Sequence, residues 1–204
     1  MFAAANYVKS MGVAVAFFTA SFNAGSAFAS DASMVTGGLT SQPIGHYEFC
    51  KRLPGECSIR SRNVSPEKMT HDFWQLIVSV NSNDNQKIKP LTDLEIYGVE
   101  EYWDYPDTVG DCEDYVLLKR RDLMQAGVSP ANLLITVVRK PDGEGHAVLT
   151  VRTDSGDFIL DNLVEGVKNW SETDYTYLKR QASSHSGRWV SIEAPSNILV
   201  GSVQ

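Results

Sequence analysis

The chain has 204 residues and a formal net charge of −7 at pH 7, from 18 basic and 25 acidic residues. This acidic balance argues against nucleic acid and against an anionic membrane surface as the main partner. The length is enough for one domain with a hydrophobic core.

The first 29 residues have the three parts of a secretory signal peptide. Lys9 precedes an apolar run over residues 11–22, and residues 27–29 (Ala-Phe-Ala) form an A-x-A cleavage signal. The apolar run is too short for a permanent membrane span. Cleavage after Ala29 leaves 204 − 29 = 175 residues with a net charge of 17 − 25 = −8, because Lys9 is lost. No later segment approaches eighteen consecutive apolar residues, so we expect an exported protein with no transmembrane segment after cleavage.

The mature chain is expected to start with a flexible segment. Residues 30–45 are small and polar, which is typical of a mobile N-terminus, and we assign residues 46–204 to a single domain.

The three cysteines divide into a close pair and a single thiol. Cys50 and Cys57 lie seven residues apart around Pro54 and Gly55, which favour a turn. An oxidising compartment would let the pair form a structural disulfide, with two free thiols as the alternative. A zinc site has little support, because no second Cys or His pair has the required spacing. Cys112 is then the unpaired thiol.

Two helical segments are predicted in the first half of the chain. Ser65 and Pro66 suit the start of a helix, and apolar residues recur at helical spacing over 69–80. The Asn- and Asp-rich residues 81–86 should end this helix. A second helical or mixed segment, 91–97, leads into an aromatic loop.

Residues 110–115 (Gly-Asp-Cys-Glu-Asp-Tyr) are predicted to open the next helix, over 112–126, with Asp111 as N-cap and Gly127 as its stop. A helix N-terminus and a neighbouring imidazolium both lower the pKa of a thiol. Cys112 is therefore a candidate nucleophile, and its own backbone N–H could hold a developing oxyanion. The alternative role is that of a small buried apolar residue.

An antiparallel sheet is predicted after the helices, which makes the domain α+β. We expect strands over residues 133–139, 146–152, 157–161 and 188–193.

The hairpin between the second and third of these strands selects a partner for His146. If Arg152 pairs with Asp157, Asp161 is a diagonal neighbour of His146 on the same face, with Cα atoms about 7–8 Å apart. Asp161 would then orient His146, as the third member of a catalytic triad does. Asp157 is better explained as a cross-strand ion pair with Arg152. A slip of one residue would put Asp161 on the wrong face.

The other histidines are weaker candidates. His71 is expected to be a hydrogen-bonded structural residue near the core face of the first helix, and His46 and His185 to be solvated. Trp103, in the aromatic loop, either lines a substrate groove beside Cys112 or packs against the helix that Cys112 opens.

Carboxylates surround the thiol in sequence, at Asp111, Glu113 and Asp114. They can simply stabilise the start of the helix. They also oppose thiolate formation unless a cation neutralises them, and a hard cation such as Ca²⁺ prefers oxygen ligands. The spacing is not that of an EF-hand.

These motifs together resemble the bacterial transglutaminase-like cysteine proteinases over roughly residues 45–195. The matching motifs are Tyr97-Gly98, Tyr102-Trp103, Pro106, 110–115, Gly127-Val128, 146–149 and 160–162. Their combined order is much more specific than any one of them.

The resemblance implies a papain-like α+β fold, with the nucleophile at the N-terminus of a helix packed on an antiparallel sheet, and a triad of Cys112, His146 and Asp161. It implies calcium on Asp111 and Glu113, and no organic cofactor. A periplasmic group in this family cuts the N-terminal region of large surface adhesins and is sequestered by an inner-membrane receptor for cyclic di-GMP.

We therefore expect an exported, periplasmic cysteine endopeptidase that works through a thioester acyl-enzyme. Transglutaminase-type acyl transfer to an amine, or amide hydrolysis on glutamine, proceeds through the same thioester and stays open. A secreted binding module without catalysis is the non-enzymatic alternative.

Overall fold

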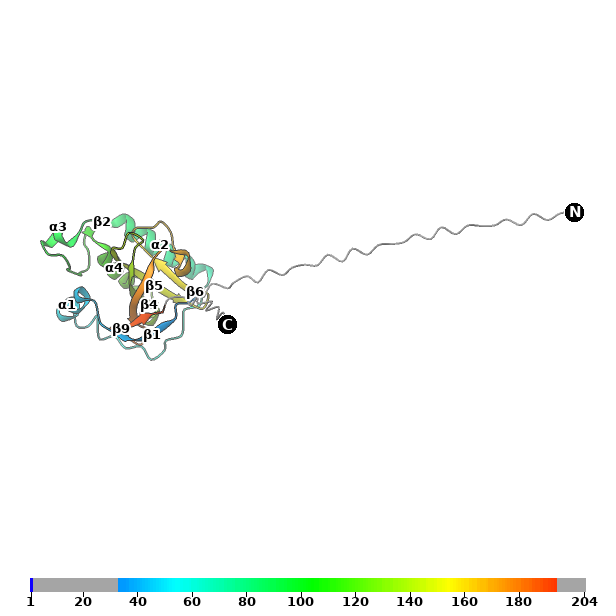
Figure 1. Cartoon of the computed structure of the whole chain (residues 1–204), viewed down its shortest axis with the longest axis horizontal. Helices are drawn as coiled ribbons and strands as arrows, with labels where there is room; N and C mark the ends of the chain where they lie inside the picture. Colours follow the sequence, from blue (N-terminus) through cyan, green and yellow to red (C-terminus); the bar gives the residue numbers. More distant parts are fainter. Residues whose placement is uncertain (2–32, 194–204) are drawn as a thin grey trace, which may run out of the picture.

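A seven-stranded antiparallel sheet covered by helices organises the protein, in a computed structural model that describes Met1 and residues 33–193 (Figure 1). This confirms the predicted α+β class. The predicted signal peptide, residues 1–29, lies outside the described residues apart from Met1. Among the described residues, no helix has both the length and the apolar character that a membrane span requires.

The helices are α1 (Ile44–Arg52), α2 (His71–Lys87), α3 (Asp93–Tyr97) and α4 (Cys112–Gln125), with short 3₁₀ turns η1 (Pro130–Asn132) and η2 (Trp170–Glu172). The large sheet has the order β1-β9-β8-β4-β5-β6-β7. Its strands are β1 (Thr36–Thr40), β4 (Leu133–Arg139), β5 (Gly145–Thr153), β6 (Gly156–Leu160), β7 (Lys168–Asn169), β8 (Thr176–Ala182) and β9 (His185–Ile192). Two short strands, β2 (Lys89–Pro90) and β3 (Val109–Gly110), pair in parallel outside it.

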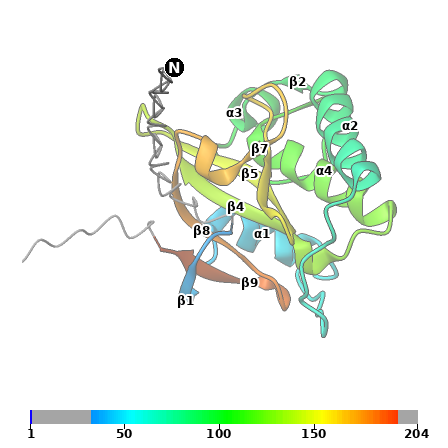
Figure 2. The ribbon, with the colours of Figure 1, turned by 90° about the vertical axis from the view of Figure 1, so that its right-hand side faces the viewer.

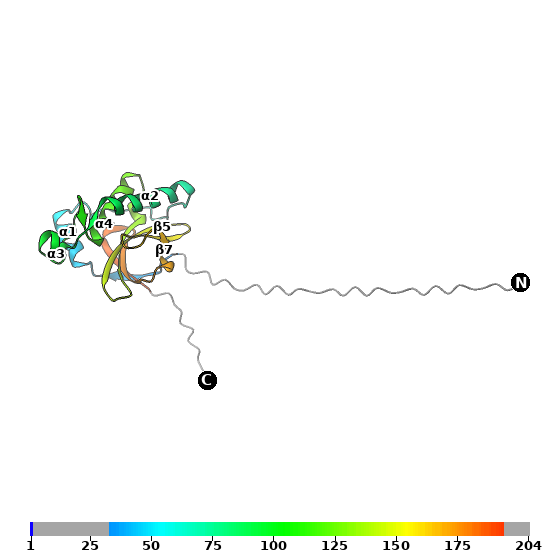
Figure 3. The ribbon, with the colours of Figure 1, turned by 90° about the horizontal axis from the view of Figure 1, so that it is seen from above.

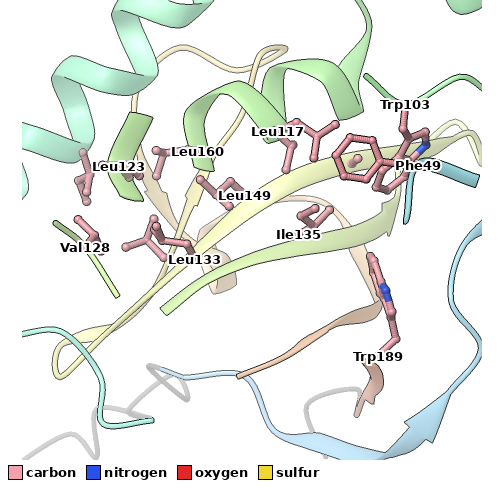
Figure 4. Close-up of a cluster of buried hydrophobic side chains, with 14 residues drawn as sticks. Phe49, Trp103, Leu117, Leu123, Val128, Leu133, Ile135, Leu149, Leu160 and Trp189 are labelled. Carbon is pink, nitrogen blue, oxygen red and sulfur yellow. The ribbon is translucent and has the colours of Figure 1, made fainter. Parts of the chain in front are cut away.

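The main hydrophobic core lies between α4 and one face of the sheet, with α2 running beside α4 (Figures 2 and 3). Leu117 of α4 meets Ile135 of β4 and Leu149 of β5 (Figure 4). Side chains alternate along a strand, so Val148 packs on the opposite face in a second cluster with Trp170. Each such burial contributes about 1.5–3 kcal/mol, so the helix that begins at Cys112 rests on a firmly packed base.

The first predicted helix is displaced along the chain. Its N-cap is Thr70 rather than Ser65, and the Thr70 hydroxyl accepts the Phe73 N–H at 3.1 Å. The Asn- and Asp-rich residues 81–86 continue α2 instead of ending it, and two of them, Asn81 and Asp84, are buried in the helix that packs along α4. Tertiary burial here overrides local turn preference. His71 opens α2 with 78% of its side chain exposed, so its predicted place near the core is wrong.

The described part of the segment predicted to be flexible, 30–45, is structured. Thr36–Thr40 form β1, which pairs with β9 at the edge of the sheet, and α1 begins at Ile44. A Cβ atom on Gly37 would lie 2.5 Å from the Ser191 hydroxyl. Gly37 lies where the register of this pairing shifts, and glycine gives no strand signal in the sequence.

Helix α1 carries a buried histidine, His46, and one cysteine of the predicted disulfide, Cys50. Cys50 and Cys57 are bonded, with Cα atoms 5.5 Å apart. His46 is 1% exposed, so the expectation of a solvated side chain is wrong. The rings of Trp103 and Trp189 lie 5.4 and 5.3 Å from it, both edge-on. Burial, followed by the charge of Arg120, lowers the pKa of His46 to about 3, so this ring is a neutral core residue.

The predicted strands are present, and Arg152 pairs with Asp157 as expected. The expected ion pair between these two side chains is not formed. Asp157 instead binds Arg180 of β8 at 2.8 Å, and Arg152 donates to Ser183 and Asn132. The missing information was β8, which the sequence pattern did not predict. His185, expected in a solvated loop, begins β9 and is half-buried.

Candidate active site

Cys112 is the first residue of α4 and, among the described residues, the free cysteine. The positive end of the helix therefore lies at the thiol, and the Cys112 N–H has no partner within the helix. Asp111 occupies the N-cap position as predicted, but its side chain makes no capping hydrogen bond. A Cβ atom on Gly110 would lie 2.8 Å from Asp114, so only glycine lets the chain enter the helix along this path.

The thiol lies between an acidic side chain and the start of β5. Cys112 donates to Glu113 Oε2 at 3.0 Å. Burial, then the charge of Glu113 and this hydrogen bond, raise the pKa of the Cys112 thiol well above its usual value. The backbone N–H of Ala147 points to the sulfur and opposes that rise. Cys112 thus lies beside the residue that follows His146, while no described hydrogen bond joins it to the His146 ring.

His146 and Asp161 make the contact that the hairpin register predicted. His146 Nε2 lies 2.9 Å from Asp161 Oδ1, and both side chains are buried. The paired part of β5 and β6 ends at Leu149 and Leu160, so the contact lies just beyond the ladder. Burial raises the pKa of Asp161, but the hydrogen bond and charge of His146, followed by other donors, outweigh it and lower the pKa. Asp161 therefore stays ionised and can hold the ring.

Each carboxylate oxygen of Asp161 has a donor. Leu163 N–H donates to Oδ1 at 2.9 Å, and the Tyr175 hydroxyl donates to Oδ2 at 2.6 Å. The Asn85 side chain donates to the Asp161 backbone carbonyl at 2.7 Å. Tyr175 was missed in the sequence because it lies in an irregular segment before β8, where no periodicity predicts its contact.

A cluster of carboxylates, which includes Glu113, lies beside the thiol. Asp93, Asp111 and Glu113 bring oxygens within 4.8 Å of one another. Asp93 was missed in the sequence. The parallel pairing of β2 with β3 brings it to Asp111, because both residues follow these strands closely. Asp111 Oδ2 accepts the Asp93 N–H at 3.2 Å, and the Asp93 carboxylate accepts the Tyr102 N–H.

The cluster is not satisfied by protein groups alone. One oxygen of Asp93 and one of Asp111 are buried without a hydrogen-bond partner. Burial raises the pKa of Asp111; burial and the charge of Asp111 raise the pKa of Glu113 to about 9. Burial also raises the pKa of Asp114 to about 8. Close, buried carboxylates of this kind repel one another, and a hard cation with oxygen ligands removes the repulsion. The residues therefore fit Ca²⁺, with Asp93 added to Asp111 and Glu113.

Trp103 belongs to the core rather than to a substrate groove. It is 3% exposed and packs against His46 and Phe49. Its indole N–H donates to Glu101 at 3.1 Å, and its carbonyl accepts from Arg52. Trp103 is therefore a buried core residue that contacts α1, whereas the packing alternative expected contacts with the helix that Cys112 opens; its burial gives no support to the predicted substrate-binding role.

Comparison with known proteins gives one consistent group. The family described as bacterial transglutaminase-like cysteine proteinase matches residues 36–197. The calcium-bound structure of LapG from Legionella pneumophila is 27% identical, with a TM-score of 0.50 over 64% of this chain and 76% of that one. The EGTA-treated structure of the same protein is 29% identical, with a TM-score of 0.46 over 56% of this chain and 64% of that one, less than two thirds of its length. A search of curated proteins found no match.

Proposed function

This chain belongs to the bacterial transglutaminase-like cysteine proteinases, and we propose that it is an exported cysteine endopeptidase whose triad is Cys112, His146 and Asp161. Its helices and antiparallel sheet form the papain-like α+β fold of that family. One observation carries the proposal. The free thiol opens a helix beside the start of β5, where a buried His146 is held by an ionised Asp161 at 2.9 Å.

In the proposed reaction, His146 takes the thiol proton through Nδ1, because Nε2 is engaged with Asp161. The Cys112 thiolate attacks the carbonyl carbon of the scissile peptide bond, and the Cys112 backbone N–H stabilises the oxyanion. The His146 imidazolium then protonates the departing amine, which leaves a thioester on Cys112. His146 next removes a proton from water, and the resulting hydroxide attacks the thioester carbonyl carbon. The C–S bond breaks, the carboxylic acid product leaves, and the His146 imidazolium returns its proton to the Cys112 sulfur. Asp161 stays ionised throughout and stabilises the imidazolium.

We also infer that Asp93, Asp111 and Glu113 hold Ca²⁺. The bound ion would supply the positive charge that neutralises the carboxylates beside the thiol. The two buried oxygens without donors support this assignment, as does the calcium-bound state of the LapG structure. With the carboxylates engaged, Glu113 would no longer hold the Cys112 proton.

The cellular setting is proposed from the sequence. The signal peptide predicted for residues 1–29 supports export to the periplasm. The family resemblance is the ground for a large surface adhesin as substrate and for an inner-membrane cyclic di-GMP receptor as partner.

The test compares the surface and secreted proteins of cells that produce the wild type or Cys112→Ala. Mass spectrometry with labelling of new N-termini should find fragments only with the wild type, and these identify the substrate and cleavage site. A new isopeptide or amine adduct in place of a fragment would instead identify acyl transfer.

Two histidine variants supply a matched control for the same experiment. His146→Ala should lose the fragments, whereas His71→Ala, which changes an exposed ring, should retain them. Identical fragment sets from the wild type and Cys112→Ala would contradict the proposed function.

A further inference from the structure

Tyr175 contacts both members of the buried His146–Asp161 pair. Its hydroxyl donates to Asp161 Oδ2 at 2.6 Å. Its ring lies 5.6 Å from the His146 ring at an interplanar angle of 61°, an edge-on contact. Tyr175 comes from the segment between η2 and β8, which is separate from the strands that carry His146 and Asp161. A third part of the chain therefore contacts the pair through Tyr175.

The hydroxyl has a specific task because Asp161 is 3% exposed. Oδ1 receives His146 and the Leu163 N–H, whereas among the described residues Oδ2 receives Tyr175 alone. The terminal torsion of an aspartate is broad and roughly two-fold, and both oxygens turn together about it, so the hydrogen bond to Oδ2 adds a third restraint to the two on Oδ1. Without the hydroxyl, a buried charged oxygen would lack a donor, and the carboxylate would be held through Oδ1 alone and less firmly oriented.

We propose that Tyr175 is a positioning residue that fixes the Asp161 carboxylate and, through it, the orientation of His146. Its importance for turnover rests on the proposed function, in which His146 moves the proton of Cys112. The contact itself does not depend on that function. The role has two separable parts, the hydroxyl on Asp161 and the ring beside His146.

Tyr177, two residues further on in β8, offers a control. Its hydroxyl bonds Thr173 at 2.8 Å, and its ring packs edge-on against Trp170 at 5.4 Å. Tyr177→Phe therefore removes an equivalent hydroxyl from a partly buried tyrosine without removing a hydrogen bond to Asp161. Tyr175→Phe removes the hydroxyl that Asp161 uses and keeps the ring.

The direct test is NMR of the imidazole N–H groups in full-length protein labelled with ¹⁵N-histidine. His146→Gln assigns the downfield signal of the His146 Nε2 proton. Tyr175→Phe should shift this signal and speed its exchange with water about three- to tenfold, the factor that corresponds to one ordinary hydrogen bond. Tyr177→Phe should leave it unchanged. An unchanged signal in Tyr175→Phe overturns the proposal.

A second measurement follows the alkylation of Cys112 by iodoacetamide at pH 7. Tyr175→Phe should slow it about three- to tenfold, Tyr175→Leu should slow it further because the ring is lost too, and Tyr177→Phe should match the wild type. Equal rates for both tyrosine-to-phenylalanine variants would overturn the link to the thiol.

The two readouts separate this inference from the proposed function. Protein that cuts nothing but shows the NMR change keeps the positioning role of Tyr175 and loses the peptidase assignment. Protein that cuts in a Cys112-dependent way without the NMR change has the reverse outcome.

Discussion

The site holds two carboxylate environments, Asp161 at His146 and the cluster at Glu113, and they differ in how fully the protein satisfies their oxygens. Asp161 has donors on both oxygens, and its pKa is lowered by His146 and the neighbouring donors despite burial. Asp93 and Asp111 each have one buried oxygen without a donor, and burial raises the pKa of both. The protein therefore supplies donors for both oxygens of Asp161, whereas the buried oxygens of Asp93 and Asp111 need protons or a cation.

The two environments shift the pKa of the Cys112 thiol in opposite directions. The helix N-terminus and a His146 imidazolium favour the thiolate, whereas Glu113 binds the thiol proton and raises the thiol pKa. In the protein by itself, burial and Glu113 dominate. A cation bound to the acidic cluster would remove the effect of Glu113 and so lower the pKa of the Cys112 thiol.

The largest expected effect comes from a change at Asp161, the carboxylate that holds His146. Asp161→Asn should lower kcat about 10²- to 10⁴-fold, because a neutral amide stabilises the imidazolium poorly and favours the wrong tautomer. The fragment assay described above, run as a time course with purified protein, measures this change.

Asp157→Asn is the control, since Asp157 is buried like Asp161 but pairs with Arg180. It should cost about 3–5 kcal/mol of stability and leave the turnover of the folded fraction intact. If Asp157→Asn lost turnover and Asp161→Asn kept it, the assigned roles would be wrong.

A smaller effect is expected from calcium binding at the acidic cluster of Asp93, Asp111 and Glu113. Calcium at about one hundred times its Kd should stabilise the wild type by about 2.7 kcal/mol, which raises Tm by about 5–10 °C. Asp93→Asn and Glu113→Gln should lose most of this rise, while Asp142→Asn, an exposed carboxylate elsewhere, should keep it. Thermal unfolding in calcium and in EGTA measures it, and an equal rise in all four proteins would contradict the assignment.

The smallest effect is a dependence of that calcium response on pH. Raised carboxyl pKa values stabilise the folded state below the unfolded values near 4, and this stability is lost as pH rises through the folded values of about 8 for Asp114 and about 9 for Glu113. Tm in EGTA should therefore fall between pH 5 and pH 9, and less so in calcium. A difference between the calcium and EGTA Tm values that stays constant with pH would count against a deprotonated cluster as the binding site.

The same contrast explains what the sequence predicted. The His146–Asp161 contact was predictable because one hairpin joins the two residues over 15 positions, so its register places both side chains. Asp93 meets Asp111 through two-residue strands that are too short for any periodicity. Tyr175 reaches Asp161 from an irregular segment. Contacts within one regular unit follow from pattern, and contacts between units depend on packing.

The fold shows the same limit. The helix at Cys112 and the strand β4 were predicted closely because caps and alternation are local signals. The edge strand β1 and the continuation of α2 depend on partners far along the chain. The burial of His46 joins α1, the Trp103 loop and β9, and no local pattern contains that information.

The most direct test of the account is the rate at which iodoacetamide alkylates Cys112 at pH 7, measured by intact mass in calcium and in EGTA. Calcium on the cluster should lower the pKa of the Cys112 thiol, and a drop of about one pKa unit gives about tenfold more thiolate. Calcium should therefore speed alkylation of the wild type at least about tenfold. Glu113→Gln should show little calcium response. Equal rates in calcium and EGTA for the wild type would contradict the claim that the acidic cluster controls the thiol.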